Sequence, residues 1–440
     1  MFKKRQPHLV IIGNGVAGVT TARHVRRRSD MNITIISAES RYHFSRTALM
    51  YIYMGHMRFE DTKPYPDWFW RQNRIDLVHG FVTEIDTDNK CVRLQDGREI
   101  AYDKLVIATG SKPNKFGWPG QDLPGVQGLY SLQDLQRLEE YTPHIRHAVI
   151  VGGGLIGIEL AEMLMSRDIP VTFLVRERYF YDIILPQEEA RLISRHILEH
   201  GVDLRLSTEL KEILPGTDGR VRAVVTSHGE EIACQFVGLT VGVHPNIEVV
   251  KNTPIETNRG VLVNEYLETN IPDVYACGDC AEIRAKEPGG RNRIEQLWYT
   301  ARMQGEALGR ILCGEHVAYD RGIWFNSAKF FDLEYQTYGQ VSPQPGDDED
   351  SFYWEHPDRK HALRIAYRKP GMQVIGFNAI GIRLRHRVCE RWIREGRTLD
   401  DVIQRLPEAN FDPEFYQRFE AEVARQYAES RHAVAESAVA

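Results

Sequence analysis

Gly13-Asn14-Gly15-Val16-Ala17-Gly18 and Gly152-Gly153-Gly154-Leu155-Ile156-Gly157 are two copies of the pattern G-x-G-x-x-G in one chain. Each copy follows an apolar run, residues 9–12 and 148–151, and precedes a helix-like segment. In such a unit the first glycine makes the turn, the second lets the backbone approach a pyrophosphate, and the third lets helix and strand pack closely. The helix N-terminus then offers N–H groups and partial positive charge to the phosphates. The sequence therefore predicts two dinucleotide sites.

An acidic residue after the second strand of each unit would bind a ribose. In the first unit Glu39 lies just past the strand at residues 33–36 and is the candidate for the adenosine ribose. In the second unit the strand at residues 171–175 ends without an acid, and Arg176 and then Glu177 follow. Because a guanidinium suits a 2′-phosphate, Arg176 favours NADPH at this site, while Glu177 leaves NADH open.

The composition narrows the class of protein. A chain of 440 residues is too long for one core and predicts two or three domains. The net charge of -6 favours neither a nucleic-acid partner nor attraction to anionic lipid. We expect no transmembrane segment and no signal peptide, because no apolar run is long enough. Six cysteines without a disulfide-framework spacing predict a reduced, cytoplasmic location, and their spacing predicts no zinc or other metal site.

Four further segments carry a specific resemblance. Residues 104–113 resemble the ATG segment of the pyridine nucleotide-disulfide oxidoreductases, a superfamily of FAD-dependent flavoproteins. Residues 242–246 resemble its G-x-x-P-N segment, and residues 275–281 resemble its second FAD motif. Residues 293–301 resemble the helix that closes over the flavin ring. The resemblance covers residues 8 to about 310 and implies FAD and NAD(P)H as cofactors.

The resemblance also implies an interrupted domain. In this superfamily the chain leaves the flavin domain at the ATG segment and returns at the G-x-x-P-N segment. Turn-rich stretches at residues 117–120 and 244–246 mark the two crossings. We therefore expect an α/β fold of two Rossmann-like domains, one inserted in the other: an FAD-binding domain at residues 1–118 and 247–318, and an NAD(P)H-binding domain at residues 119–246.

The remaining residues, 319–440, predict a smaller α+β domain. Residues 323–341 are rich in aromatic and β-branched side chains, as strands are, and resemble the start of the C-terminal domain in rubredoxin and ferredoxin reductases. After them we expect a polar loop, two strands and two helices, in that order, at residues 343–350, 362–367, 373–378, 383–395 and 413–429.

The segment after the first ribose acid separates the branches of the superfamily. The disulfide branch needs C-x-x-x-x-C there and the CoA-disulfide reductase branch needs one cysteine, but residues 42–51 hold none. Residues 44–49 instead resemble the Y-x-R-x-x-L segment of rubredoxin reductases, ferredoxin reductases and nitrite reductase flavoprotein domains. Arg46 would then lie near the FAD, or else form a surface salt bridge. Cys277 and Cys280 form a C-x-x-C, but we expect them to be buried in the FAD motif and not to act as a dithiol.

The resemblance further implies roles near the two rings. Glu159 would help to orient the nicotinamide, and its usual lysine partner is replaced by Tyr51, whose hydroxyl can donate a hydrogen bond without charge. Trp298 would pack near the flavin ring or belong to the core. Glu159 and Tyr51 are the candidate catalytic residues. The predicted cofactor-binding set is Gly13, Gly15, Val16, Ala17, Gly18, Glu39, Arg46, Ala108, Thr109, Gly110, Gly152, Gly154, Leu155, Ile156, Gly157, Arg176, Gly242, Gly278, Asp279 and Trp298.

These features together predict an FAD-dependent NAD(P)H oxidoreductase that passes electrons to an external acceptor, a small iron–sulfur or rubredoxin-like protein. The basic stretch at residues 383–397 could dock an acidic ferredoxin. One alternative is a type II NADH:quinone oxidoreductase, although the segment at residues 413–422 is too acidic for a membrane-surface helix. Another is a redox-sensing interaction protein with slow turnover. A homodimer is the commonest assembly and stays open.

Overall fold

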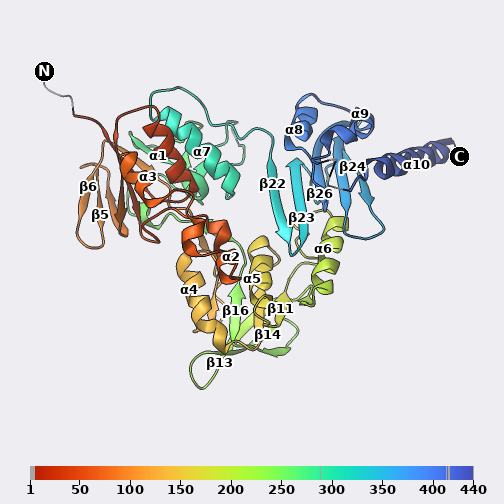
Figure 1. Ribbon diagram of the computed structural model, residues 1–440, viewed down its shortest axis with the longest axis horizontal. Helices are drawn as coiled ribbons and strands as arrows, with labels where there is room; N and C mark the ends of the chain where they lie inside the picture. The colour runs from red at the N-terminus through yellow and green to blue at the C-terminus, as the bar shows by residue number, and fades with distance from the viewer. Residues whose placement is uncertain (1–4, 288, 413, 415–416, 440) are drawn as a thin grey trace. The chain divides into compact units, whose positions relative to one another are not determined.

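The computed structural model describes residues 5–287, 289–412, 414 and 417–439 (Figure 1). The chain divides into two compact units. The first unit comprises Met1–Gly117, Gly125–Ile145 and Leu239–Arg321, and the second comprises Trp118–Pro124, Arg146–Gly238 and Gly322–Ala440. The first glycine motif therefore lies in the first unit, and the second glycine motif lies in the second unit together with the C-terminal region.

A five-stranded parallel sheet forms the centre of the first unit. Its strands are ordered β19-β7-β1-β2-β3. Residues 9–12 of β1 are buried, as expected for a parallel strand covered on both faces. The strand bounds are His8–Ile12 for β1, Asn32–Ser37 for β2, Ile75–His79 for β3, Lys104–Ile107 for β7 and Val274–Ala276 for β19.

Two long helices of the first unit pack closely against each other. Helix α1 (Val16–Arg26) follows β1 through the first glycine motif, and α7 (Trp298–Ile311) lies along it (Figure 1). A Cβ added to Gly305 of α7 would lie 2.6 Å from the carbonyl oxygen of Ala17. Glycine at this position therefore allows the two backbones to approach as they do.

Shorter elements complete the first unit. Three small sheets have the orders β4-β5-β6, β8-β17 and β18-β20-β21. The strands are β4 (Val82–Asp86), β5 (Cys91–Leu94), β6 (Glu99–Ala101), β8 (Ser111–Pro113), β9 (Val126–Gln127), β17 (Val243–Pro245), β18 (Val261–Val263), β20 (Ala281–Ile283) and β21 (Arg293–Ile294). The helices are α2 (Leu49–Tyr53), α3 (Asp67–Gln72) and α4 (Leu132–Tyr141), with 3-10 turns η1 (Arg46–Ala48), η2 (Phe59–Thr62), η3 (Thr142–His144), η4 (Glu248–Val250) and η5 (Gly278–Cys280).

The second unit has two halves, which we name the Rossmann half (residues 146–238) and the C-terminal half (residues 322–439). In the Rossmann half, β12, β11 and β10 pair in parallel, and β16 follows on the far side of β10. A three-stranded sheet, β13-β14-β15, joins them. The bounds are β10 (Ala148–Val151), α5 (Leu155–Met165), β11 (Val171–Leu174), α6 (Gln187–Glu199), β12 (Asp203–Arg205), β13 (Leu210–Pro215), β14 (Val221–Thr226), β15 (Glu231–Ala233) and β16 (Phe236–Leu239).

The C-terminal half is an antiparallel sheet with helices. The strand order is β22-β23-β26-β25-β24. Trp354 and Trp392 are buried in its core, and both are among the largest fully buried side chains. The bounds are β22 (Phe325–Phe330), β23 (Leu333–Gly339), β24 (Glu349–Glu355), β25 (Ala362–Arg368), β26 (Gln373–Ile380), α8 (His386–Arg394), α9 (Leu399–Gln404), η6 (Leu406–Ala409) and α10 (Glu420–Val439).

A buried ion pair joins the two halves of the second unit. Arg364 of β25 and Glu189 of α6 have side chains that are 8% and 1% exposed. The Arg364 Nε donates to Glu189 Oε1 at 2.7 Å, and its Nη2 donates to Glu189 Oε2 at 2.8 Å. Asn378 Nδ2 donates to Glu189 Oε1 at 3.3 Å. Arg364 Nη2 also donates to Glu188 Oε2, and its Nη1 donates to the Ser351 hydroxyl, both at 2.7 Å. This network sets the position of α6 on the C-terminal sheet.

The predicted α/β architecture is confirmed, and several local predictions need correction. The predicted polar loop at residues 343–350 is present at residues 343–348. Its last two residues, Glu349 and Asp350, already belong to β24, because they pair with β25 at the sheet edge. Helix α8 is shorter than the predicted helix at residues 383–395. Helix α10 begins at Glu420, so residues 417–419 are not helical as predicted. Residues 413, 415 and 416 of that prediction lie outside the described residues.

The boundaries of the three predicted domains stay a prediction. The contacts group residues 125–145 with the first unit and the C-terminal half with the Rossmann half. Among the described residues, helices long and apolar enough to cross a membrane are absent.

The buried ion pair gives a first prediction. Arg364→Ala should lower the free energy of unfolding of the protein by about 3–5 kcal/mol, because it leaves the Glu189 carboxylate buried without its cation. Urea unfolding followed by tryptophan fluorescence would measure the change. Arg368→Ala is the matched control, since Arg368 lies on the same strand with a side chain 54% exposed and 3.7 Å from Asp348. The control should stay within about 1 kcal/mol of the parent; equal losses in both variants would contradict the prediction.

Candidate functional site

The first glycine motif forms an open cradle at the end of β1. Gly13 has a φ of +117°, and a Cβ added to it would lie 2.0 Å from the carbonyl oxygen of Ala108. A Cβ at Gly18 would lie 2.2 Å from the carbonyl oxygen of Gly13. A Cβ at Gly15 would meet no described atom within 4 Å. The tight turn, the close packing and the open approach that a pyrophosphate site requires are therefore all present.

The N-terminus of α1 faces this cradle. Gly15 is the N-cap, Val16 and Ala17 begin the helix, and the first turn consists of uncharged residues. Its N–H groups are therefore available to a phosphate, and the helix dipole favours one. Gly278 of the second FAD-type motif, with a φ of +78°, lies against this turn, since a Cβ there would be 2.9 Å from the Ala17 Cβ. These residues fit a bound FAD pyrophosphate.

Glu39 and Arg46 form an ion pair beside the cradle. Arg46 Nη1 donates to Glu39 Oε1 at 2.8 Å, and Nη2 donates to Oε2 at 2.5 Å. The N–H of Leu132, at the start of α4, donates to Oε1 at 2.8 Å. The side chains of Arg46 and Glu39 are 34% and 19% exposed, so Arg46 forms a salt bridge that is partly buried. The place of Arg46 near the FAD stays a prediction. Ribose binding by Glu39 stays a prediction, and it would use the acceptor positions that this pair leaves open.

The chain crosses between the predicted domains through a tightly bonded pair of segments. The Thr109 hydroxyl donates to the carbonyl oxygen of Asn246 at 2.6 Å, and the N–H of Asn246 donates to the carbonyl oxygen of Gly110 at 2.8 Å. Nearby, Gly242 has a φ of +85° and accepts from the N–H of Asn114 at 3.0 Å. The ATG-like and G-x-x-P-N-like segments thus lie side by side, as β8 and β17 also show.

Asp279 lies in a polar network in the first unit. The Ser111 hydroxyl donates to Asp279 Oδ2 at 3.0 Å, and Gln296 Nε2 donates to the Ser111 oxygen at 2.8 Å. The N–H of Ser111 donates to the Tyr130 hydroxyl at 2.9 Å. Burial raises the pKa of Asp279, and the Ser111 hydrogen bond and the charge of Arg46 oppose that rise. A carboxyl held this way can accept hydrogen bonds from the polar chain of a flavin nucleotide.

Sequence reasoning missed three of the polar residues around this site. Ser111 lies within the ATG-like segment, directly after Gly110, and this position was a usable signal. Tyr130 had no local signal, because it reaches Ser111 from a separate segment. His43 holds the first glycine loop through its Nδ1, 2.7 Å from the carbonyl oxygen of Asn14. Burial lowers the pKa of His43 to about 4, so its ring is neutral at physiological pH.

The cysteines and the aromatic residue of the FAD-type motifs can also be placed. Cys277 and Cys280 are both 0% exposed and form no disulfide, so their predicted burial is confirmed. Burial raises the pKa of each thiol. That they do not act as a dithiol stays a prediction. Trp298 is 42% exposed, so it is not a core aromatic. Its packing near the flavin ring stays a prediction. Tyr51 lies on α2 with its ring stacked on His56.

The second glycine motif forms a similar cradle in the second unit. Gly152 has a φ of +113°, and a Cβ at Gly154 would meet no described atom within 4 Å. Leu155 and Ile156 begin α5, and the buried Gly157 belongs to its first turn. The open approach and the helix N-terminus are thus repeated, which fits a second dinucleotide.

The two candidate ribose residues of the second site have different environments. Arg176 has a side chain that is 69% exposed, and its Nε donates to Glu177 Oε1 at 2.6 Å. The Glu177 side chain is only 15% exposed. A Cβ added to Gly153 would lie 3.6 Å from Glu177 Oε2, so the carboxylate lies at the glycine loop. Arg176, predicted as a 2′-phosphate ligand, is held by the acid beside it.

Glu159 lies on α5 between acidic and basic neighbours. Burial raises the pKa of Glu159 to about 7, the Glu162 charge adds to the rise, and Lys329 opposes it. Lys329 of β22 donates to Glu162 Oε1 at 2.8 Å. Lys329 of the C-terminal half is therefore a cation whose charge acts on Glu159. The resemblance to the superfamily predicts such a cation from the position of Tyr51, which is uncharged.

Comparison with known proteins identifies the family. A family model described as pyridine nucleotide-disulphide oxidoreductase matches residues 7–305. The chain belongs to this family. It is 31% identical over 312 residues to the NADH-rubredoxin oxidoreductase of Clostridium acetobutylicum, covering 71% of this chain and 76% of the relative. It is 29% identical over 402 residues to the ferredoxin–NAD(+) reductase component of the p-cumate 2,3-dioxygenase system of Pseudomonas putida, covering 89% and 94%.

A solved structure extends the similarity to the C-terminal half. The crystal structure of the NADH:rubredoxin oxidoreductase from Clostridium acetobutylicum matches with a TM-score of 0.73 and 26% identity, over 91% of this chain and all of that one. The predicted superfamily and branch, the FAD and NAD(P)H cofactors and the oxidoreductase activity are thereby confirmed. The role of each predicted site residue stays a proposal.

The raised pKa of Glu159 gives a second prediction. The carboxylate is the better hydrogen-bond acceptor for a nicotinamide carboxamide, and it forms only as the pH rises through about 7. The rate of flavin reduction by NADH should therefore increase with an apparent pKa near 7. Glu159→Gln should be about tenfold slower at pH 8 and lack that step. Stopped-flow absorbance at 450 nm would measure both. Glu162→Gln is the matched control, and it should keep the step but move it to lower pH, because the Glu162 charge raises the pKa of Glu159. A pH profile that is the same in the parent and in Glu159→Gln would sink the assignment.

Proposed function

We propose that this protein uses NADH to reduce a small iron–sulfur or rubredoxin-like protein. The observation that carries the proposal is a pair of glycine cradles in a chain that has no cysteine in the segment where the disulfide branch places its redox thiols. Residues 42–51 contain no cysteine, and Cys277 and Cys280 are fully buried. Electrons must therefore leave the first unit for an external acceptor without a cysteine intermediate.

In this proposal the first unit binds FAD and the second unit binds NADH. Bound FAD supplies the redox chemistry that converts a hydride into electrons for the acceptor. Gly15 and the α1 N-terminus would bind its pyrophosphate, and Asp279 its polar chain. In the second unit Gly154 and the α5 N-terminus would bind the pyrophosphate of NADH, and Glu159 would orient its nicotinamide. The protein thus contributes position and electrostatics.

The class of acceptor is inferred from relatives of similar length. One is named an NADH-rubredoxin oxidoreductase and the other a ferredoxin–NAD(+) reductase component, and this chain covers 76% and 94% of them. All six cysteines are unpaired, which supports a location in the reducing cytoplasm. A homodimer stays a prediction.

The basic stretch at residues 383–397 contributes less to docking than its composition suggests. Arg391 pairs with Glu408, Arg394 with Glu390, and Arg397 with Glu395 and Asp401. Arg383 pairs with Glu334. Because acids neutralise most of these arginines, the acceptor proposal does not depend on steering by this stretch.

We also propose NADH as the preferred nucleotide. A carboxylate at the glycine loop can accept hydrogen bonds from both ribose hydroxyl groups, whereas its negative charge repels a 2′-phosphate. Glu177 occupies this position with a side chain 15% exposed, and it holds the guanidinium of Arg176 at 2.6 Å. The sequence favoured NADPH because it could not show which of these adjacent residues lies against the loop.

The nucleotide preference gives a third prediction. The parent protein should have a higher kcat/KM for NADH than for NADPH. Glu177→Ala should raise the relative kcat/KM for NADPH about 10–100-fold, because it removes the repulsion of the 2′-phosphate. Arg176→Ala is the matched control and should change the NADPH value less than about threefold. A parent that prefers NADPH and loses that preference in Arg176→Ala would show that Arg176 is the specificity residue instead.

The acceptor gives a fourth prediction. The FAD-loaded protein, reduced anaerobically with NADH, is mixed with oxidised rubredoxin, a [2Fe–2S] ferredoxin or a water-soluble quinone, and flavin reoxidation is followed at 450 nm. We expect at least one iron protein to give a second-order rate constant about tenfold or more above that of the quinone. Faster reoxidation by the quinone would favour the quinone reductase alternative. Slow reoxidation by all three would favour a redox-sensing protein.

A further inference from the structure

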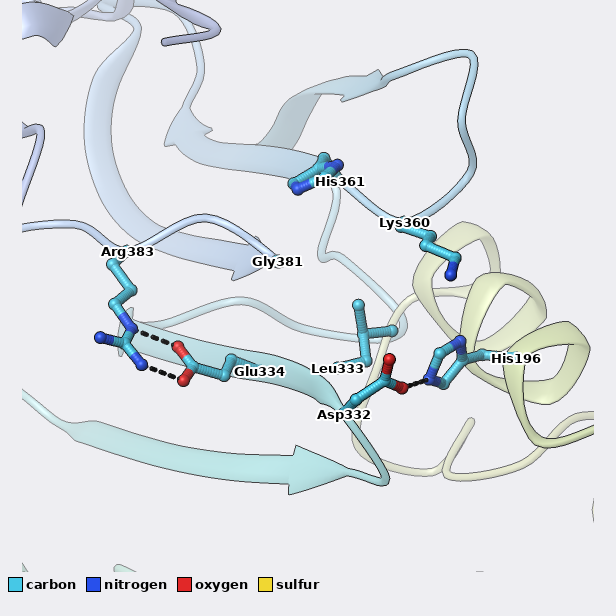
Figure 2. Close-up of a pocket in the computed structure, with 8 residues that line it drawn as sticks. All are labelled: His196, Asp332, Leu333, Glu334, Lys360, His361, Gly381 and Arg383. Carbon is cyan, nitrogen blue, oxygen red and sulfur yellow. Dashed lines mark hydrogen bonds and ion pairs between the residues drawn. The ribbon is translucent and has the colours of Figure 1, made fainter. Parts of the chain in front are cut away.

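Two histidines at the C-terminal end of α6 and one aspartate converge in the second unit. His196 lies in the last turn of α6, and His200, four residues on, is its C-cap residue, so the two side chains lie on the same side of the helix end. Asp332 lies in the turn between β22 and β23 of the C-terminal half. Its Oδ1 is 2.8 Å from His196 Nε2 and 3.1 Å from His200 Nε2 (Figure 2 shows the contact with His196). Two imidazole nitrogens therefore point at one carboxylate oxygen.

A neutral His200 ring has one N–H group, but both of its nitrogens face atoms that can only accept a hydrogen bond. Its Nδ1 lies 2.9 Å from the carbonyl oxygen of His196, which can only accept a hydrogen bond, so Nδ1 carries the ring proton. Its Nε2 then presents a lone pair to the Asp332 carboxylate, which is also only an acceptor. A cation between Nε2 and Oδ1 resolves the conflict. A hydrogen bond from the other ring nitrogen to a carbonyl is also the usual support of a metal-bound histidine.

The surrounding residues hold the three side chains in place. Phe331 has a φ of +56°, a conformation that is rare for a bulky residue. Its ring stacks on His200 with centroids 4.5 Å apart and planes at 8°. The His196 side chain is 2% exposed and meets the His200 ring edge-on at 4.4 Å. The strained turn thus positions both Asp332 and the Phe331 ring that packs on His200. Backbone strain of this kind is concentrated at binding sites.

One side of the cluster is open to solvent. A cavity of about 250 Å³ borders His196 and Asp332, and Lys360 and His361 also line it (Figure 2). The Asp332 side chain is 68% exposed, so an ion can enter and a water molecule can complete its coordination. Glu334, at the same cavity, is already paired with Arg383. Two imidazoles, one carboxylate and an open position suit Zn²⁺ better than Mg²⁺ or Ca²⁺, which prefer all-oxygen sites.

We propose that His196, His200 and Asp332 form a binding site for Zn²⁺ that joins α6 of the Rossmann half to the β22–β23 turn of the C-terminal half. The ion would bind the two Nε2 atoms and the Asp332 carboxylate, with water as the fourth ligand. Because the ligands come from both halves, bound Zn²⁺ stabilises their packing in addition to the Arg364–Glu189 pair. The proposal does not depend on the acceptor or on the preferred nucleotide.

Zinc binding to the FAD-loaded protein tests the proposal. The protein is treated with EDTA, desalted and titrated with ZnCl₂ by isothermal titration calorimetry. We expect one Zn²⁺ per chain and a higher midpoint of thermal unfolding with Zn²⁺ than with Mg²⁺. His200→Gln and Asp332→Asn should each weaken Zn²⁺ binding at least about 100-fold while the flavin absorbance and circular dichroism stay unchanged. Co²⁺ in place of Zn²⁺ should give visible absorption bands that both variants lose.

A neighbouring cluster provides the matched control. His356 and His361 place their Nδ1 atoms 3.0 Å and 2.7 Å from Asp358 Oδ2, within the C-terminal half alone. His356→Gln, which leaves the cavity-lining His361 in place, should bind Zn²⁺ as the parent does. Loss of binding in His356→Gln, with retention in His200→Gln and Asp332→Asn, would overturn the proposal. Absence of stoichiometric binding to the parent would overturn it equally.

Discussion

The close approach of backbone to backbone at the first glycine motif is the constraint on which the first unit depends. Gly13 lies so near the carbonyl oxygen of Ala108 that no side chain fits between β1 and β7. Gly278 and Gly305 can lie against the first turns of α1 for the same reason, because neither has a side chain. Strand, helix and second FAD-type motif therefore converge on one helix N-terminus, which remains open beside Gly15. The nucleotide site is thus a consequence of packing that only small residues allow.

The parts that could be predicted from the sequence are those with a local pattern. Both glycine motifs, their strands and the burial of Cys277 and Cys280 follow from runs of a few residues. The Glu39–Arg46 pair and the Ser111–Asp279 bond join side chains from separate segments, and no local pattern indicates them. Strand β24 escaped prediction because its first residues are acidic and gain their strand pairing only from β25 at the sheet edge. Tertiary contacts decide such cases.

Helix α6 shows how polar contacts can set the arrangement of two packed halves. Glu189 in its N-terminal turn binds Arg364, and His196 and the C-cap residue His200 at its C-terminal end contact Asp332. A buried ion pair costs desolvation energy that its attraction only partly returns, so apolar residues could pack there with similar stability. The hydrogen bonds of the Arg364–Glu189 pair are directional, however, and they form in only one orientation of α6 on the sheet. We infer that these contacts select the register of the helix more than they add to stability.

The same C-terminal sheet also changes the electrostatics of the predicted nicotinamide site. The resemblance to the superfamily predicts a lysine partner for this glutamate, and Tyr51, the residue that the sequence predicts at the lysine's position, carries no charge. Lys329 of β22 supplies a cation within the second unit, where it pairs with Glu162, one turn from Glu159. Burial is the main cause of the raised pKa of Glu159, and the charge of Glu162 adds to it. Lys329, which is bound to Glu162, opposes this rise without cancelling it. The pKa of Glu159 near 7 is therefore the result of burial that its neighbouring cation compensates only in part.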